Sequence, residues 1–329
     1  MLRRAFAGFA VLATWVALTA AAAAAAGAPS PGGSYPSDAW LALHFRPLLM
    51  FDSAERWRPL DVDRFLREPG IQACPGPGLA PAACVPFTGV AQLTPAVAYL
   101  DLRGSAHDGS DAIAPDLATC PKSLPSLRDC DLRGSSKIYA HVVRSPDPSA
   151  RVPPKRVAID YWWFLRYNAY SIDEHEGDWE GVTVIVDPFG RRVLEVHYAA
   201  HSDVWRYDRG VPILIRGRVE VFSALGGHAS YPRPCFRLCR QTGGTLPEAR
   251  FDGHRAWVGN TARGCHASCV RLMPSGPDGL APASWDAWGG RWGAPFAPAF
   301  PPPLTPSFQR RFRHPFASRL SHRRLFRIA

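Results

Sequence analysis

The chain has 329 residues, of which 47% are hydrophobic and 11% aromatic, and a formal net charge of +10 at pH 7. This charge lies mostly at the two ends. Arg3 and Arg4 carry two positive charges, and residues 310–327 contain seven arginines and no acidic residue, which leaves roughly +1 for residues 29–309. A nearly neutral body gives no support to the basic face that a nucleic-acid-binding protein needs, so we expect no nucleic-acid partner.

The first 28 residues have the pattern of an export signal. Arg3 and Arg4 give a positive start, residues 5–18 are apolar, and the alanine-rich run that follows offers small-residue cleavage sites. We therefore expect residues 1–28 to be a signal peptide and the protein to be secreted or periplasmic. No later segment is apolar enough to cross a bilayer, so we expect no transmembrane helix in the mature chain.

The rest of the chain predicts one domain built from strands. A linker rich in proline, glycine and serine covers residues 29–36, and the folded domain is expected over 37–309. Trp40–Phe51 is predicted to be a short helix or a strand. Strand patterns follow at Ala96–Leu102, Lys137–Arg144, Arg156–Leu165, Gly181–Val186, Arg192–Tyr198 and Ile213–Ala224. Long amphipathic periodicity and a βαβ rhythm are missing. The sequence thus predicts an all-β fold, an antiparallel β-sandwich with long disulfide-tied loops and little helix.

Eight cysteines in an exported chain predict disulfides. Cys74 and Cys84 close one short loop, and Cys120 and Cys130 close another. Two further elements share the Cys-x-x-x-Cys spacing: Cys235 with Cys239, and Cys265 with Cys269. We expect two bridges to join the first of these elements to the second. A zinc site with four thiolates is the alternative for these last four cysteines.

Residues 310–329 alternate aromatic or leucine side chains with arginines. Such a pattern can contact an anionic surface. Pro315 interrupts any helix in this segment, which favours the other interpretation, a basic disordered tail.

The segment Glu174–Glu180 holds one histidine and four carboxylates just before a β-branched strand. If the strand has begun at Asp178, then Asp178 and Glu180 project from the same face, and His175 lies in the turn before it. Oxygen ligands with one imidazole suit a hard divalent cation such as Ca²⁺, Mg²⁺ or Mn²⁺. The alternative is a polar turn whose acids stay solvated.

Several residues are candidates to complete this site. Asn168 follows the aromatic strand and offers a carbonyl oxygen, and His228 follows two glycines that allow close approach of the backbone. His201 ends a hairpin strand and is predicted to face the same edge. Trp179 has two interpretations, core packing or ligand stacking.

Two further residues have competing interpretations. Arg291 stands between Trp288 and Trp292 and is predicted to be either a structural cation–π clamp or an anion contact. Glu176 is a candidate general base, as is His228, if the cation activates a water.

Blocks of residues in a fixed order resemble the family named for vacuolar protein sorting-associated protein 62. They span most of residues 38–309 and are Leu43–Ser53 with Glu55 and Pro59, Ile159–Phe164 with Tyr167 and Asn168, His175–Glu180, Gly227–Pro232 and Trp288–Gly293. The name of the family implies vacuolar sorting, a role that an exported chain does not share, and resemblance in fold does not transfer function.

The acidic segment is also similar, more faintly, to the secreted necrosis-inducing toxins of plant pathogens. Their motif is Gly-His-Arg-His-Asp-Trp-Glu before a hydrophobic strand of a β-sandwich. The resemblance implies that His175, Asp178 and Glu180 help to hold a divalent cation at a surface that binds a sugar-lipid. This chain departs from the motif at Glu174, Glu176 and Gly177, which puts the membrane target of the toxins in doubt here.

Two functions follow as hypotheses. The first is an exported β-sandwich that binds a divalent cation and, through it, a surface glycan or lipid head group. The second is a metal-assisted secreted hydrolase. The chain has no Gly-x-Ser-x-Gly motif and no phosphate-binding loop, and no convincing pair of base and nucleophile, which favours the first. A structural envelope protein is a third alternative. The sequence leaves open whether the protein is an enzyme.

Overall fold

The computed structural model describes a large part of the chain. The described residues are 35–51, 55, 57, 59–76, 84–102, 137–145, 155–170, 174–200, 203–207, 214–215, 217–232, 270–274, 284–294, 301–317 and 320–321. The predicted signal peptide, His201 and six of the eight cysteines lie outside them. No helix among the described residues is long and apolar enough to cross a membrane.

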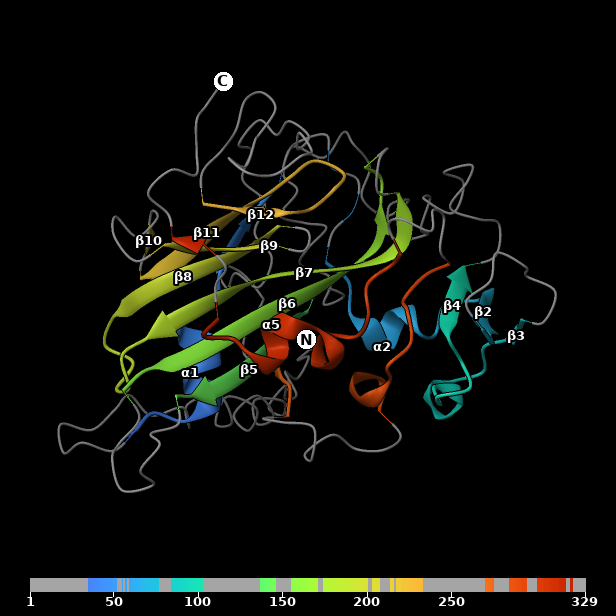
Figure 1. The fold of residues 1–329 in the computed structure, drawn as a ribbon, viewed down its shortest axis with the longest axis horizontal. Helices are drawn as coiled ribbons and strands as arrows, with labels where there is room; N and C mark the ends of the chain where they lie inside the picture. Colours follow the sequence, from blue (N-terminus) through green and yellow to red (C-terminus); the bar gives the residue numbers. More distant parts are fainter. Residues whose placement is uncertain are drawn as a thin grey trace, which may run out of the picture.

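A seven-stranded sheet forms the centre of the molecule, with the order β13-β5-β6-β7-β8-β9-β14 (Figure 1). Its strands are β5 (Ile138–Arg144), β6 (Val157–Asn168), β7 (His175–Val186), β8 (Val193–Ala200), β9 (Asp203–Tyr207), β13 (Val270–Leu272) and β14 (Leu320–Ser321). The five inner strands pair antiparallel in sequence order, because short connections join them. The two edge strands, β13 and β14, pair parallel to β5 and β9.

A smaller sheet packs on one face of this sheet. It consists of β1 (Leu48–Met50), β11 (Arg218–Ser223), β10 (Leu214–Ile215) and β12 (Ser230–Tyr231). Helix α1 (Asp38–His44) begins at Ser37, whose side chain accepts a hydrogen bond from the Trp40 N–H, and packs on the same face. The core between the two sheets contains, among others, Leu49, Tyr161, Trp163, Val184 and Val221, all fully buried. This packing confirms the predicted all-β sandwich.

The other face of the seven-stranded sheet carries a second core, which is rich in aromatic residues. A three-stranded sheet of β3 (Val85–Pro86), β2 (Ile71–Cys74) and β4 (Tyr99–Leu102) contributes to it. So does helix α2 (Val62–Phe65), while 3-10 turns lie at η2 (Val90–Gln92), η5 (Trp285–Ala287) and η6 (Pro306–Phe308). Trp162, Phe164, Trp179 and Trp292 pack there. The fold therefore has two hydrophobic cores, one on each side of its central sheet.

Most predicted strands are present, with shifted ends. The predicted strand over Ile213–Ala224 is divided into β10 and β11, because the chain turns at Gly217 with φ +77°. Trp40–Phe51 forms both a helix and a strand, α1 and β1. The prediction missed β2, which joins the three-stranded sheet by pairing with β3 and β4.

The segment after Gln309 is not the disordered tail that the sequence predicted, at least as far as Ala317. Helix α5 (Arg310–Arg313) lies over the near face of the central sheet (Figure 1). The Arg311 guanidinium lies 3.6 Å from the centroid of the Trp162 ring, and its Nη1 lies 3.3 Å from Oδ1 of Asp160. Phe312 stacks on His141 at 3.8 Å between ring centroids. The prediction failed because it treated these arginines as a solvated set, whereas the buried Asp160 binds one of them.

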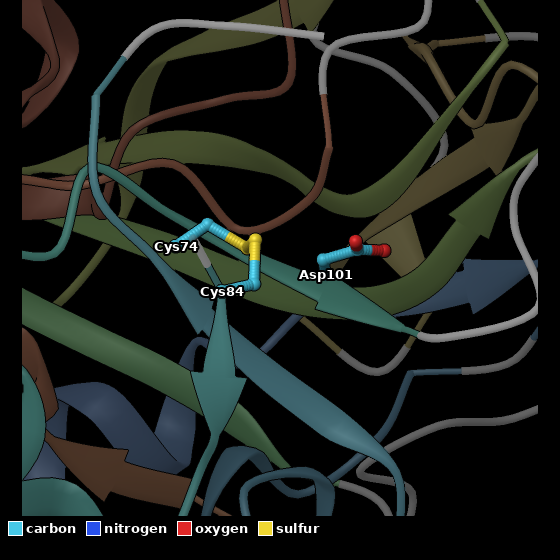
Figure 2. Close-up of side chains that lie close together, drawn as sticks. All are labelled: Cys74, Cys84 and Asp101. Atoms are coloured by element: carbon cyan, nitrogen blue, oxygen red, sulfur yellow. A yellow bond between two sulfur atoms is a disulfide. The ribbon is translucent and has the colours of Figure 1, made fainter. Parts of the chain in front are cut away.

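The disulfide predicted between Cys74 and Cys84 is confirmed, with 4.2 Å between the two Cα atoms (Figure 2). It joins the end of β2 to the residue before β3.

The other predicted bridges lie outside the described residues and stay predictions. One is the bridge between Cys120 and Cys130. The other two were expected to join Cys235 and Cys239 to Cys265 and Cys269, and the structure describes none of these four cysteines. The predicted framework of eight paired cysteines is therefore confirmed for its first pair.

Candidate functional site

The acidic segment forms the start of β7, where the strand is irregular. The β6–β7 register places Asn168 opposite His175 and Leu165 opposite Asp178. Between these pairs Gly177 has φ +56°, a left-handed conformation that favours glycine. The Cβ of any other residue here would collide with the backbone of Trp292. After this point the strand alternates regularly, with Val182, Val184 and Val186 in the first core.

Asp178 and Glu180 share the face of β7 that is directed toward the first core, as the sequence predicted. Trp179 lies in the second core, and alternation puts its two neighbours on the opposite face. Both acids are buried, at 5% and 7% exposure. A buried carboxylate is stable only where hydrogen bonds or opposite charge compensate for the lost water. The partner of Asp178 therefore decides what this position can do.

That partner is His228, which lies between two carboxylates. Its Nδ1 is 3.0 Å from Oδ2 of Asp178, and its Nε2 is 3.5 Å from Oε1 of Glu55. The ring is fully buried, and the backbone of His228 has φ +56°, unusual for a residue other than glycine. Because both ring nitrogens face acids, the imidazole is protonated; it donates to Asp178 and faces Glu55 over a longer distance. We call Glu55, His228 and Asp178 the carboxylate–histidine clamp.

Glu55 is fixed by the backbone around it. Its Oε2 accepts a hydrogen bond from the Gly226 N–H at 2.7 Å, and its Oε1 accepts one from the Trp57 N–H at 2.9 Å. The clamp thereby connects the segment after β1, the turn between β11 and β12, and strand β7. Its three parts are far apart in the sequence and meet only in the folded chain.

Charge pairing in the clamp shifts two pKa values in opposite directions. Burial alone lowers the pKa of His228, but the charge of Glu55 and the hydrogen bond with Asp178 outweigh burial and raise it to about 9. Burial raises the pKa of Glu55, whereas the charge of His228 and the hydrogen bonds from the Gly226 and Trp57 N–H groups lower it to about 2. At neutral pH, His228 is therefore a cation and Glu55 an anion.

His175 and Asn168 form a second pair at the end of β6 and the start of β7. The Asn168 Nδ2 lies 3.3 Å from the His175 Nε2, and the His175 Nδ1 lies 3.1 Å from the carbonyl oxygen of Glu176. A carbonyl oxygen only accepts, so this network assigns the proton to Nδ1 and the lone pair to Nε2. Asn168 Oδ1 accepts a hydrogen bond from the Tyr170 N–H.

The five predicted metal ligands thus form two hydrogen-bonded pairs and one further acid. Asp178 pairs with His228 and Asn168 with His175, while Glu180 lies near the charge of Arg311. Their ligand atoms do not gather into one group. In the described part of the chain, the only three side chains of this kind with ligand atoms mutually within 4.8 Å are Cys74, Cys84 and Asp101. Metal binding at β7 stays a prediction.

Other predicted site residues have structural roles. The Glu176 side chain is directed away from the clamp, and its Oε2 accepts hydrogen bonds from the N–H groups of Leu102 and Ala294. Trp179 packs against Trp285 and Trp292 in the second core. Arg291 donates from Nη1 to the carbonyl oxygen of Pro302 and bridges β4 through its backbone.

Glu55 is the member of the clamp that we did not predict as a site residue. It lies 123 positions before Asp178 in the sequence, so no local spacing connects the two. The available signal was its place in the first block of residues that resembles the family. That block is rich in residues that pack into the first core, such as Leu49 and Phe51, so its sequence pattern indicates packing and gives no sign of the electrostatic role of Glu55.

We expect Gly177→Ala to destabilise the fold by more than the cost of a left-handed residue alone, which is about 1–2 kcal/mol. The added Cβ would collide with the Trp292 backbone, which must then move. Gly217→Ala is the matched control, because Gly217 is also left-handed and has nothing within 4 Å of the added Cβ. Urea unfolding of both variants measures the difference. Equal losses would show that the contact of Gly177 with Trp292 is unimportant.

Two solved structures are similar in a structural comparison. One is described as the crystal structure of necrosis and ethylene inducing protein 2 from the causal agent of cocoa's witches broom disease. It has 14% identity and a TM-score of 0.36, and the match covers 81% of this chain and 89% of that one. The other, NLPPya in complex with mannosamine, has 15% identity and a TM-score of 0.36. That match covers 82% of this chain and 92% of the other chain. We draw no conclusion about this chain from either.

A search among curated proteins finds no match. A family model described as vacuolar protein sorting-associated protein 62 matches residues 162–246. This segment contains most of β6, all of β7, and His228. The resemblance to that family, which the sequence predicted, is therefore confirmed for residues 162–246.

Proposed function

We propose that this protein is a non-catalytic binding protein that holds a divalent cation at the start of β7 and, through it, a glycan or a lipid head group. The observation that supports binding over hydrolysis is the state of the two candidate bases. His228 is fully buried with both ring nitrogens next to carboxylates, and Glu176 is fully buried with backbone N–H groups on its carboxylate. A general base must reach its proton and be unprotonated at the working pH.

The clamp supports a ligand role for Asp178. Protein carboxylates that bind metals are usually held by a second group, which fixes their orientation. His228 holds Oδ2 of Asp178, which leaves Oδ1 as the oxygen to meet a cation. His175 is the nearest imidazole in the sequence to add to it, and a cation would take the Nε2 lone pair in place of the Asn168 N–H that donates to it. Glu180 is on the same face of the strand. A hard cation at this position also prefers hydroxyl oxygens, which glycans and lipid head groups supply.

We further propose that the protein acts outside the cytoplasm, on the basis of the export pattern in residues 1–28. A surface glycan or lipid is available to an exported protein without any transport step. Intact-mass measurement of the exported chain tests this part, and a mass that still includes Arg3 and Arg4 would contradict it.

We expect Ca²⁺, Mg²⁺ or Mn²⁺ to raise the melting temperature of protein freed of metal by a chelator. Binding to the native state alone stabilises it by about 2.7 kcal/mol when free cation is 100 times the dissociation constant. Asp178→Asn should abolish this increase, since it removes the ligand charge while retaining an oxygen to accept the His228 hydrogen bond. Each variant is compared with its own metal-free form, by calorimetry and by elemental analysis.

Asp63→Asn is the control, because the Asp63 carboxylate is 46% exposed and paired with Arg271 on another part of the surface. It should retain the full metal-dependent shift. A shift that is the same in Asp178→Asn would contradict the cation site. Release of a chromogenic product from a panel of glycoside and ester substrates, lost in Asp178→Asn, would favour the hydrolase in place of the binding protein.

A further inference from the structure

The disulfide Cys74–Cys84 and the Asp101 carboxylate lie close together on the three-stranded sheet (Figure 2). Their sulfur and oxygen atoms are mutually within 4.8 Å. Cys74 ends β2, Cys84 precedes β3, and Asp101 belongs to β4, so three different segments of one sheet supply the three groups. Strands position side chains with less freedom than loops do.

A fourth group lies on the same face of the sheet. Leu100 and Leu102 of β4 pack into the second core, so Tyr99 and Asp101 are on the opposite face. The register pairs Cys74 with Tyr99 and Gln72 with Asp101. Side chains in such directly opposed positions have Cβ atoms about 4.5–5.5 Å apart. Gln72 and Cys74 therefore share this face with Asp101.

Gln72 has an unusual feature for a buried side chain. It is 4% exposed, and its amide nitrogen contacts the carbonyl oxygens of Gly70 and Ile71 at 3.4 Å. Its Oε1 has no hydrogen-bond partner among the described residues. A buried amide oxygen without a partner costs about 1–3 kcal/mol. Gln72 stands directly opposite Asp101 in the register of β2 and β4, so its unpartnered oxygen is an independent indication that a ligand belongs here.

We propose that Cys74, Cys84 and Asp101 form a redox-controlled site for a zinc-like divalent cation. In the oxidised protein the sulfur atoms are bonded to each other and the site does not bind metal. A dithiol reductant would transfer two electrons to the disulfide and itself become a disulfide, leaving two thiols. These release two protons on binding the cation, which then has two thiolates and one carboxylate as ligands, with Gln72 Oε1 as the fourth. Zinc combines sulfur and oxygen ligands with tetrahedral geometry.

The surroundings of Cys74, Cys84 and Asp101 are compatible with both the disulfide and the reduced, cation-bound state. Cys84 and Asp101 are half-buried, which gives a reductant and a cation access to the site, whereas Cys74 is buried. The Tyr99 hydroxyl lies 4.0 Å from the Cys84 sulfur and is placed to donate to a thiolate. The site is independent of the proposed function, since it shares no residue with the clamp.

Cobalt titration of the full chain tests the proposal, because thiolate-bound Co²⁺ gives a charge-transfer band in the near ultraviolet. The chain is reduced with a phosphine, which is then removed without air. The comparison is between the wild-type chain, a Cys74→Ser/Cys84→Ser double variant, and Asp101→Asn. The other six cysteines are present in all three proteins, so the Co²⁺ that they bind cancels when two proteins in the same redox state are compared. Near-ultraviolet circular dichroism monitors folding.

We expect the reduced wild-type chain to bind one more equivalent of Co²⁺ than the double variant does. The oxidised wild-type chain should bind no more than the oxidised double variant. Asp101→Asn, which leaves both cysteines in place, should weaken this extra equivalent at least tenfold. Asp178→Asn should leave it unchanged, which separates this site from the proposed site on β7. Equal binding by the reduced wild-type chain and the double variant, or an unchanged affinity in Asp101→Asn, would overturn the proposal.

Discussion

Replacing His228 by asparagine should lower the free energy of unfolding by about 3–5 kcal/mol, the usual cost of removing one partner of a buried ion pair. The variant leaves the carboxylates of Glu55 and Asp178 buried without the cation between them. Asparagine accepts the left-handed backbone of this position better than other non-glycine residues. The measured loss therefore reports on charge and not on backbone strain. Urea unfolding at pH 6 gives the value.

Adding Glu55→Gln to this variant should recover part of the loss, because it removes one unpaired charge while the amide keeps an oxygen for one of the two N–H groups, those of Gly226 and Trp57, that donate to Glu55. Such recovery is the sign of energetic coupling between neighbouring residues. A loss in His228→Asn below about 1 kcal/mol, the size typical of an exposed ion pair, would contradict the clamp.

The shifted pKa values of His228 and Glu55 predict how the stability of the protein changes with pH. The pKa of His228 is raised from 6.5 to about 9, so its contribution is complete below pH 6.5 and disappears as the pH rises through 9. The pKa of Glu55 is lowered from 4.5 to about 2, so its contribution is complete above pH 4.5 and disappears as the pH falls through 2. Stability from the clamp should be greatest between pH 4.5 and 6.5.

Between pH 6.5 and 9 the wild-type chain should lose roughly 3 kcal/mol relative to His228→Asn, at 1.36 kcal/mol for each pH unit. The difference between the two unfolding curves is the quantity to follow, since other groups titrate in both proteins. A constant difference across this range would mean that His228 is neutral in the folded state.

A chain that ends at Gln309 should be less stable by at least about 3 kcal/mol than one that ends at Ser321. The shorter chain loses Arg311, which neutralises the buried Asp160 carboxylate, and Phe312, which is 3% exposed. The longer chain retains every described residue of this segment. A disordered tail predicts equal stability for the two, so thermal and urea unfolding decide between these outcomes.

Two point variants show which residue of α5 causes the loss of stability. Arg311→Leu should reproduce most of the loss, because Asp160 keeps its hydrogen bonds from Trp162 Nε1 at 2.6 Å and Thr183 Oγ1 at 2.7 Å but no longer has the guanidinium. Arg313→Leu is the matched control, since Arg313 is exposed. Equal effects of the two substitutions would show that burial of Arg311 is not the cause.

Some elements of the fold can be predicted from local sequence patterns alone. The strands β5, β6 and β8 lie within three residues of their predicted bounds, because alternating and β-branched side chains encode a strand locally. Cys74 and Cys84 are ten residues apart, and their pairing follows from a short loop. The parallel pairing of β1 with β11 was not predictable in this way, since its partners are separated by 172 positions, as for Leu48 and Glu220.

The residues of the candidate site also fall into two groups, those whose positions the sequence predicts and those that only the folded chain brings together. The sequence alone predicted that Asp178 and Glu180 share a face once the strand has begun, because the period of a strand is two residues. It placed His175 in the turn before the strand, whereas β7 begins at His175. Only the tertiary structure decided that His228 and Glu55 bind to this strand and that Arg311 is a core residue. The reason is physical: a strand pattern is a property of neighbours along the chain, whereas the neutralisation of a buried charge depends on whichever segments the packed core brings to it.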